Sequence, residues 1–82
     1  MNIDHAKYFL TLSKTQHIQK AAKLLGISPT AISHGIAKLE EELGVKLTAK
    51  VGRNIVLTDK GIEFSKRIEK VLLEIELIKE GI

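Results

Sequence analysis

The chain contains no cysteine and only one proline among its 82 residues. Without cysteine, neither disulfide bonds nor thiol chemistry is available, and a cytoplasmic location is permitted. No apolar run approaches the roughly 18 residues that a membrane helix needs, and the first ten residues do not form a signal peptide. We therefore expect a soluble, cytoplasmic protein without a membrane partner.

The signals of catalysis and of cofactor binding are missing as well. His5, His17 and His34 lie on different segments, without a paired carboxylate or a metal-ligand spacing. The six glycines form no loop that would cradle a phosphate. We therefore expect no enzyme, no catalytic residue, no metal and no cofactor.

The charge is mildly basic and unevenly distributed. The net charge is +3; residues 1–60 hold nine Lys or Arg against five Asp or Glu, whereas residues 61–82 hold four against five. This excess suits a nucleic-acid partner, although a solvated lysine-rich surface would also carry it. A chain this short buries little surface, so part of its apolar surface is expected to meet a partner chain.

The strongest pattern lies between residues 18 and 44. Ser28 is suited to cap a helix, Pro29 fits the first helical position because it has no N–H, and Gly44 supplies the stop. Between these signals, four apolar residues fall on one stripe: Ile32, Ile36, Leu39 and Leu43. The opposite face is small, polar and partly cationic, with Thr30, Ser33, His34, Ala37 and Lys38.

A shorter helix precedes this one and has its own apolar stripe, formed by Ile18, Ala21, Ala22 and Leu25. Gly26 allows a sharp exit from it, and Ile27 fills the corner. Two helices joined by a short glycine-containing turn are typical of the helix-turn-helix unit, whose second helix lies in the DNA major groove. An ordinary pair of antiparallel helices is the alternative.

The first residues predict a further helix. Asn2 is suited to cap a helix of about residues 3–14. One apolar side of it would consist of Ile3, Ala6, Phe9 and Leu10, and another of Tyr8 and Leu12. Such a two-sided helix suits a position between the core and a partner chain.

The segment after Gly44 loses the helical period. Val45 and Leu47 alternate with polar residues, residues 52–54 have the composition of a turn, and residues 55–57 that of a returning strand. This pattern predicts a β-hairpin wing. Its tip would carry three residues able to meet phosphates or enter a minor groove: Lys50, Arg53 and Asn54. A basic hairpin that contacts only solvent is the alternative.

Thr58 and Asp59 are suited to begin a last helix. Six apolar residues then repeat at the heptad steps of a coiled-coil seam: Phe64, Ile68, Val71, Ile75, Ile78 and Ile82. Leu73 and Leu77 begin a second stripe, so the helix could face its own domain on one side and a partner's helix on the other. We expect dimerisation, because so short a chain cannot cover both stripes; a single core within the chain is the alternative.

Taken in order, these residues resemble the N-terminal DNA-binding region of LysR-type transcriptional regulators. The matching residues span nearly the whole chain: Phe9-Leu10, Ala21-Ala22, Leu25, the stretch 28–33, Ile36, Leu39-Glu40, Leu43-Gly44, Leu47, Leu57-Thr58 and Gly61. The resemblance implies a mainly α fold, in which a winged helix-turn-helix of three helices and a short β-hairpin is followed by a long C-terminal dimerisation helix. Residues 1–58 would form the DNA-binding domain and residues 59–82 the linker helix.

The chain departs from the family's pattern at several positions. The family usually has Phe where this chain has Thr48, and Arg where it has Lys50. It often has Ser at the position of His17, and it favours Gln then Pro where this chain has Pro29 and Thr30. The packing of the wing and a base contact by that Gln therefore do not follow from the resemblance.

The patterns and the resemblance together predict a dimeric bacterial transcriptional regulator that binds a double-stranded inverted-repeat operator. The expected DNA contacts are Thr30 and His34 as base readers, Ser33 and Lys38 as phosphate contacts, and Lys50, Arg53 and Asn54 on the wing. A module of the same shape that binds another protein is the competing class. The chain would be a fragment of a longer regulator or a stand-alone DNA-binding unit, and a small-molecule effector would act only through a C-terminal domain that this chain does not include.

Gly35 contradicts its place inside a helix, since glycine there costs roughly 0.5–1 kcal/mol relative to alanine. It falls on the flank of the recognition helix, away from the centre of the polar face, and relatives commonly carry a longer side chain there. We expect a methyl group to fit, so that Gly35→Ala stabilises the fold and leaves operator affinity nearly unchanged.

Overall fold

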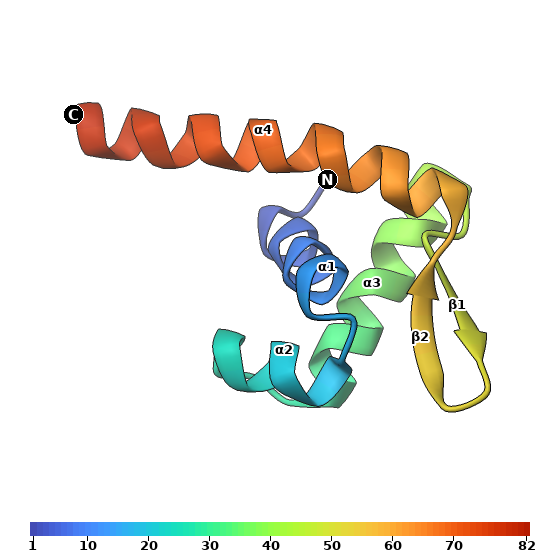
Figure 1. Cartoon of the computed structure of the whole chain (residues 1–82). Coiled ribbons are helices and arrows are strands. Elements are labelled where there is room, and N and C mark those ends of the chain that lie inside the picture. Colours follow the sequence, from blue (N-terminus) through green and yellow to red (C-terminus); the bar gives the residue numbers. More distant parts are fainter.

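The computed structural model describes all 82 residues, from Met1 to Ile82. Four helices and one β-hairpin follow one another: α1 (Ile3–Thr15), α2 (Ile18–Leu25), α3 (Pro29–Leu43), β1 (Thr48–Val51), β2 (Asn54–Leu57) and α4 (Asp59–Gly81). In Figure 1, the first three helices pack together, the hairpin extends to one side of them, and α4 crosses above them and projects beyond them. The predicted winged helix-turn-helix with a long final helix is confirmed.

Three helices begin at the side chains that the sequence predicted. Asn2 caps α1, Ser28 caps α3 and Thr58 caps α4. In each case the side-chain oxygen accepts the backbone N–H of the residue three positions later, at 3.0–3.1 Å. His17 caps α2 in the same way, because its Nδ1 accepts the N–H of Lys20 at 3.2 Å. A histidine therefore performs the capping that a serine performs elsewhere.

Left-handed backbone ends the first three helices. Gly26 after α2 and Gly44 after α3 have φ angles of 69° and 70°, which glycine adopts without steric cost. Gln16 after α1 adopts the same conformation, with a φ of 52°, and is the one residue other than glycine with a positive φ. The backbone at Gln16 is therefore strained, and this conformation turns the chain sharply from α1 into α2.

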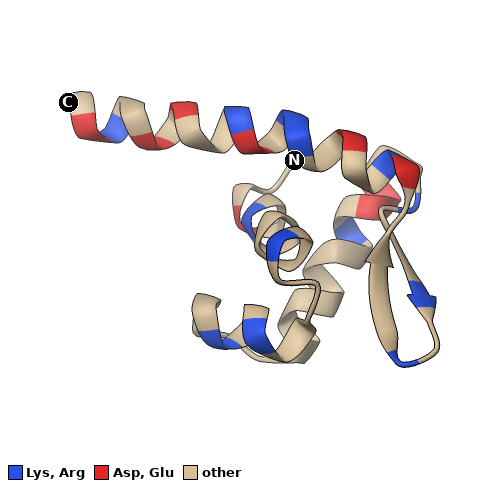
Figure 2. Ribbon diagram, in the orientation of Figure 1, with Lys and Arg blue, Asp and Glu red and all other residues tan.

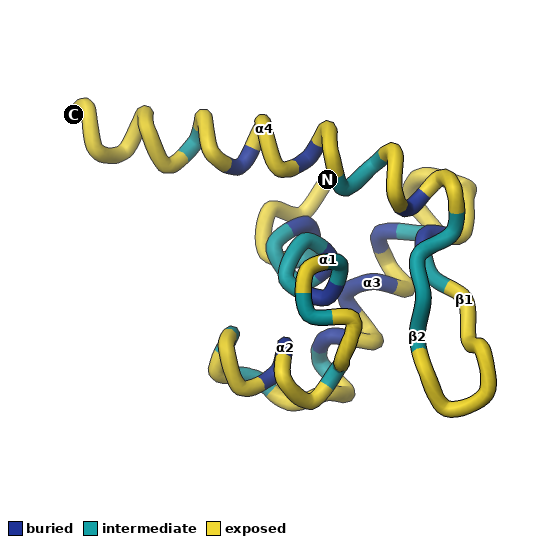
Figure 3. Tube along the Cα trace, in the orientation of Figure 1, coloured by how far each residue is buried: buried dark blue, intermediate teal, exposed yellow.

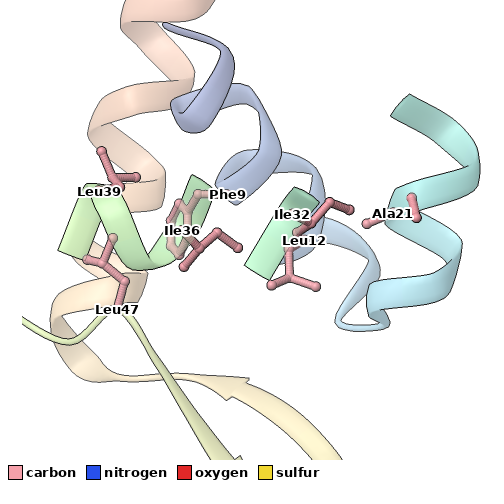
Figure 4. Close-up of a cluster of buried hydrophobic side chains, with 8 residues drawn as sticks. Phe9, Leu12, Ala21, Ile32, Ile36, Leu39 and Leu47 are labelled. Carbon is pink, nitrogen blue, oxygen red and sulfur yellow. The ribbon is translucent and has the colours of Figure 1, made fainter. Parts of the chain in front are cut away.

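The main core lies between α1, α2, α3 and the base of the hairpin. Its eight buried residues, seven of them labelled in Figure 4, are Phe9, Leu12, Ala21, Ala22, Ile32, Ile36, Leu39 and Leu47. The predicted apolar stripe of α3 is confirmed for three of its four residues. Leu43 is the exception: it is 36% exposed and lines an open hollow between the end of α3 and the start of α4.

Most apolar residues of α1 pack within the chain, but Ile3 stays 48% exposed, so the expectation that one side meets a partner stays a prediction. Phe9 and Leu12 face the main core, whereas Ala6 faces a second, smaller core against α4. The two cores meet at Phe9 and Phe64, whose ring centroids lie 5.5 Å apart. α1 therefore lies between α3 and α4 and joins them.

α4 packs on α1 as far as Ile75, and its last residues extend beyond this contact. Ile68 is buried and both Phe64 and Ile75 are half-buried against this small core, although the heptad pattern assigned all three to a seam between chains. Leu72, which the heptad omitted, is also buried there. Figure 3 shows that residues 76–82 are exposed throughout. None of the four helices has both the length and the apolarity that crossing a membrane requires.

Gly35 is buried, and the expectation that a methyl group fits there is wrong. α1 crosses α3 at this position, and the ring of Tyr8 lies against the Gly35 backbone. A Cβ atom on residue 35 would lie 2.7 Å from Cδ2 of Tyr8 and 3.0 Å from Cδ2 of His5. Ordinary contacts between carbon atoms are about 3.5–4.0 Å. The missing side chain therefore serves the close approach of two helices, which the sequence of α3 alone does not reveal.

Candidate nucleic-acid interface

The polar face of α3 takes no part in either core. Because Ile32, Ile36 and Leu39 turn toward α1 and the hairpin base, the opposite side of the helix faces solvent. All five residues predicted on that side are exposed: Thr30, Ser33, His34, Ala37 and Lys38. The hydroxyl, imidazole and ammonium groups on this face are therefore accessible to a ligand outside the chain.

The predicted wing is present, with shifted boundaries. β1 and β2 are antiparallel, and Thr48 pairs with Leu57. The first strand begins at Thr48 rather than at Val45, which lies outside the hairpin and is exposed. Asn54 is the first residue of β2 rather than part of the turn, which Gly52 makes with a φ of 63°.

Alternation along the strands decides where the wing's cations lie. Residues paired across the hairpin share a face, so Lys50 lies on the same face as Ile55. Ile55 and Leu57 pack against the main core and anchor the wing there. Lys50 is therefore carried on the face turned toward α3, while Arg53 is exposed at the tip.

An open hollow of about 310 Å³ separates the wing from α3. Ser33 of α3 and Lys50 of the wing both line it, so the structure brings these two predicted contacts together. Thr48 also lines this hollow, at the position where the family usually has Phe. The wing keeps its place without that aromatic because Ile55 and Leu57 hold it.

A second hollow, of about 510 Å³, lies between the wing tip and the start of α2. Arg53 and Asn54 line it from the wing, and His17 and Gln19 from α2. The sequence did not single out His17 and Gln19 as site residues; the only available signal was their place at the start of the helix-turn-helix. Thr30, His34 and Lys38 line neither hollow and occupy the outer side of α3.

Basic and acidic residues are separated on this side of the molecule. Figure 2 shows Lys and Arg on α2 and on the wing with no acidic residue beside them, whereas α4 carries both signs along its length. The acidic residues of α3 are confined to its last turns, at residues 40–42. The positive charge is therefore concentrated around the N-terminal part of α3, the part of a recognition helix that usually reaches base edges.

Glu40 has a role that the sequence did not indicate. Its Oε2 atom accepts the backbone N–H of Leu47 at 2.7 Å and that of Thr48 at 3.2 Å. Its side chain is only 10% exposed. The bonded residues lie seven and eight positions away, beyond the end of α3, so no local pattern could have predicted the contact.

Residues 3–62 match the family model of the bacterial regulatory helix-turn-helix proteins of the lysR family. The chain belongs to the LysR family. Among curated LysR-family relatives, it is 42% identical over all 82 residues to the HTH-type transcriptional regulator YybE of Bacillus subtilis strain 168, and it covers 28% of that protein. The chain thus spans between about a quarter and a half of the length of the curated relatives it matches. The expectation that it is not an enzyme is confirmed, because the family consists of regulators.

Solved structures of LysR-family domains bound to DNA have the same fold. The BenM DNA-binding domain in complex with catB site 1 DNA has a TM-score of 0.91 and 31% identity, covering 98% of this chain and 89% of that one. The CbnR DNA-binding domain in its DNA complex also has a TM-score of 0.91, with 29% identity and coverage of 98% and 92%. The likeness includes α4 as well as the winged helix-turn-helix.

Proposed function

We propose that this chain binds double-stranded DNA as the DNA-binding unit of a dimeric bacterial transcriptional regulator located in the cytoplasm. The observation that carries the proposal is the exposed polar face of α3, which nothing in the chain covers and which a cationic wing flanks. The likeness to LysR-family domains that are bound to DNA supports it.

Within this proposal, α3 enters the major groove and the wing meets the flanking backbone or minor groove. Thr30 and His34, one turn apart on the exposed face, read base edges, while Ser33 and Lys38 contact phosphates. On the wing, Lys50, Arg53 and Asn54 are the contacts.

α4 is the proposed dimerisation element. Several of its apolar residues stay about half exposed or more in the single chain: Val71, Leu73, Leu77, Ile78 and Ile82. Such a row on a free helix end favours a second copy of the helix as its partner. The division into residues 1–58 and 59–82 would then separate two functions. It does not separate two cores, because α4 packs on α1 as far as Ile75.

In a longer regulator, a small-molecule effector would bind a domain that follows α4. The share of the curated relatives' length that this chain covers supports that arrangement. Two equivalent chains would place their recognition helices on an inverted-repeat operator, because the symmetry of a dimer is repeated in the half-sites.

A salt titration tests the DNA-binding proposal. Lys38→Ala, Lys50→Ala and Arg53→Ala should each weaken binding to any duplex and lower the salt slope by about one for each phosphate that a chain no longer neutralises. Lys70→Ala removes the same charge from α4 and is the matched control. Unchanged affinity in all three interface variants, or an equal loss in the control, contradicts the assignment.

The loss of a base contact differs from the loss of a phosphate contact in its effect on binding. Thr30→Ala or His34→Ala should relax discrimination at particular base pairs by roughly 1–3 kcal/mol, while affinity for unrelated sequences hardly changes. Selection of bound duplexes from a random pool measures this preference. Full retention of the parent's preference in both variants would mean that specificity comes from the wing or from DNA shape.

Association through α4 is tested at an exposed position. Ile78→Asp places a charge where an interface would bury it, without touching either core of the single chain. Sedimentation should show a monomer for this variant and a dimer for Ile78→Leu. A dimeric Ile78→Asp would place the partner surface elsewhere.

A further inference from the structure

Glu40 joins the recognition helix to the wing, and we propose that it is a positioning residue for the wing's contacts with DNA. The inference rests on the proposed function, because it concerns how the wing reaches the DNA backbone while α3 lies in the major groove. Glu40 lies in the last turns of α3, and its side chain is nearly covered although it carries a charge.

The Glu40 carboxylate holds the two residues from which the wing starts. Its two hydrogen bonds, from the N–H groups of Leu47 and Thr48, connect two different elements of the chain. Hydrogen bonds with one charged partner are about twice as strong as neutral ones. The ion pair of Glu40 with Lys46 is weak by comparison, because Nζ lies 3.8 Å away on a side chain that is 82% exposed.

Thr58, the cap of α4, bonds residues 46 and 47 through their carbonyl groups. The Thr58 hydroxyl donates to the carbonyl oxygen of Lys46 at 2.6 Å, and the Thr58 N–H donates to that of Leu47 at 3.1 Å. We call residues 46–48 the wing root. Thr58 fixes the root to α4. Glu40 bonds the backbone of the root to the recognition helix, in addition to the Leu47 side chain, which is buried in the main core.

A small movement at the wing root becomes large at the tip. The four residues of β1 extend about 13 Å at about 3.3 Å per residue, so a swing of about 10° displaces Arg53 by about 2 Å. A hydrogen bond from nitrogen to a phosphate oxygen exists only over about 2.7–3.2 Å. Ile55 and Leu57 anchor the wing to the main core, and the orientation that Glu40 adds at the root affects whether Lys50 and Arg53 meet phosphates while α3 is in the groove.

The direction of the effect separates this role from simple electrostatics. A carboxylate near DNA repels phosphates, so its removal alone should strengthen binding. Loss of positioning has the opposite effect: Glu40→Ala should weaken binding by about threefold or more and lower the salt slope. Glu41→Ala removes the same charge from the next, exposed residue and leaves the wing root intact, which makes it the matched control.

The test is a double-mutant cycle between Glu40 and Arg53, measured on the whole chain with a generic duplex over a salt series. The measured quantity is the affinity at about 50 mM salt divided by the affinity at about 200 mM salt. In the parent, Arg53→Ala should lower this ratio by about 3.5-fold for each phosphate that it leaves without its cation. In the Glu40→Ala background the same change should have little effect, because Arg53 no longer reaches its phosphate. Glu40→Gln should bind at least as tightly as the parent and keep the full effect of Arg53→Ala, since its amide oxygen still accepts both N–H groups.

Circular dichroism and thermal unfolding of the same samples correct for any unfolded fraction. If Glu40→Ala does not fold, Glu40→Asp replaces it in the cycle, because it keeps the charge but is one methylene too short for both bonds. An equal loss from Arg53→Ala in both backgrounds overturns the proposal, as does no loss in the parent. Stronger binding by both Glu40→Ala and Glu41→Ala overturns it too. If the parent binds no duplex at any salt concentration, the proposed function itself falls.

Discussion

Replacing Gly35 by alanine has two opposing effects on stability. It raises the helix propensity of α3, and it creates a steric clash where α1 crosses α3. The gain is roughly 0.5–1 kcal/mol, because alanine is the better helix former. The clash arises because the new Cβ would lie 2.7 Å from Cδ2 of Tyr8, so that the ring must retreat by about 1 Å to restore ordinary contact. Tyr8 packs against the main core and cannot retreat freely.

The clash should outweigh the gain. Forcing an extra methyl group into a packed contact typically costs about 1–3 kcal/mol. We therefore expect Gly35→Ala to lower the free energy of unfolding by about 1 kcal/mol, which corresponds to a fall of about 4–8 °C in Tm for a domain of this size. Denaturant unfolding followed by circular dichroism measures the difference directly.

A second variant isolates the ring as the cause. In a Tyr8→Ala background the nearer obstacle is gone and the 3.0 Å contact with Cδ2 of His5 remains, so the same glycine-to-alanine change should cost less than in the parent or become stabilising, by at most roughly 0.5–1 kcal/mol. The reasoning is refuted if Gly35→Ala stabilises the parent chain, because the ring would then offer no resistance. It is also refuted if the loss is equally large without the ring.

Three further changes test the packing and the strain described above. Gly61→Ala would drive a Cβ into the carbonyl oxygen of Leu47, where both sides are backbone; we expect a loss of more than about 2 kcal/mol in urea unfolding, and a loss below half of that would contradict the close approach. Gln16→Gly removes the strain of a left-handed residue and should raise the free energy of unfolding by up to about 1 kcal/mol; a lower Tm would mean that the glutamine side chain matters. Thr48→Phe should fill the hollow beside Ile55 and raise the free energy of unfolding by about 1–2 kcal/mol, and a destabilised variant would show that the hollow cannot take a ring.

The positions of the elements could be predicted from the sequence because their signals are local. Asn2, Ser28 and Thr58 each bond an N–H three residues later, and Gly26 and Gly44 each adopt a backbone angle that other residues disfavour. Such interactions depend on neighbours within one turn, so the order of residues is enough to specify them. The exposed face of α3 follows in the same way, since a helix that buries one stripe exposes the other.

The sequence was less informative wherever two elements meet. The heptad of α4 combined Ile68, which is buried on α1, with Ile78, which is exposed, because periodicity shows that residues share a face but not what covers it. The buried Leu72 lies outside that heptad for the same reason.

Only the tertiary structure determined how the helices pack against one another and which contacts hold the wing in place. Gly35 owes its missing side chain to a ring on α1, more than twenty positions earlier, and Glu40 bonds residues beyond the end of its own helix. Contacts of this kind are set by the crossing of helices and by the path of the chain between elements. The sequence therefore determined which surface of α3 is exposed, and tertiary packing determined how α1 supports that helix and how the wing is held beside it.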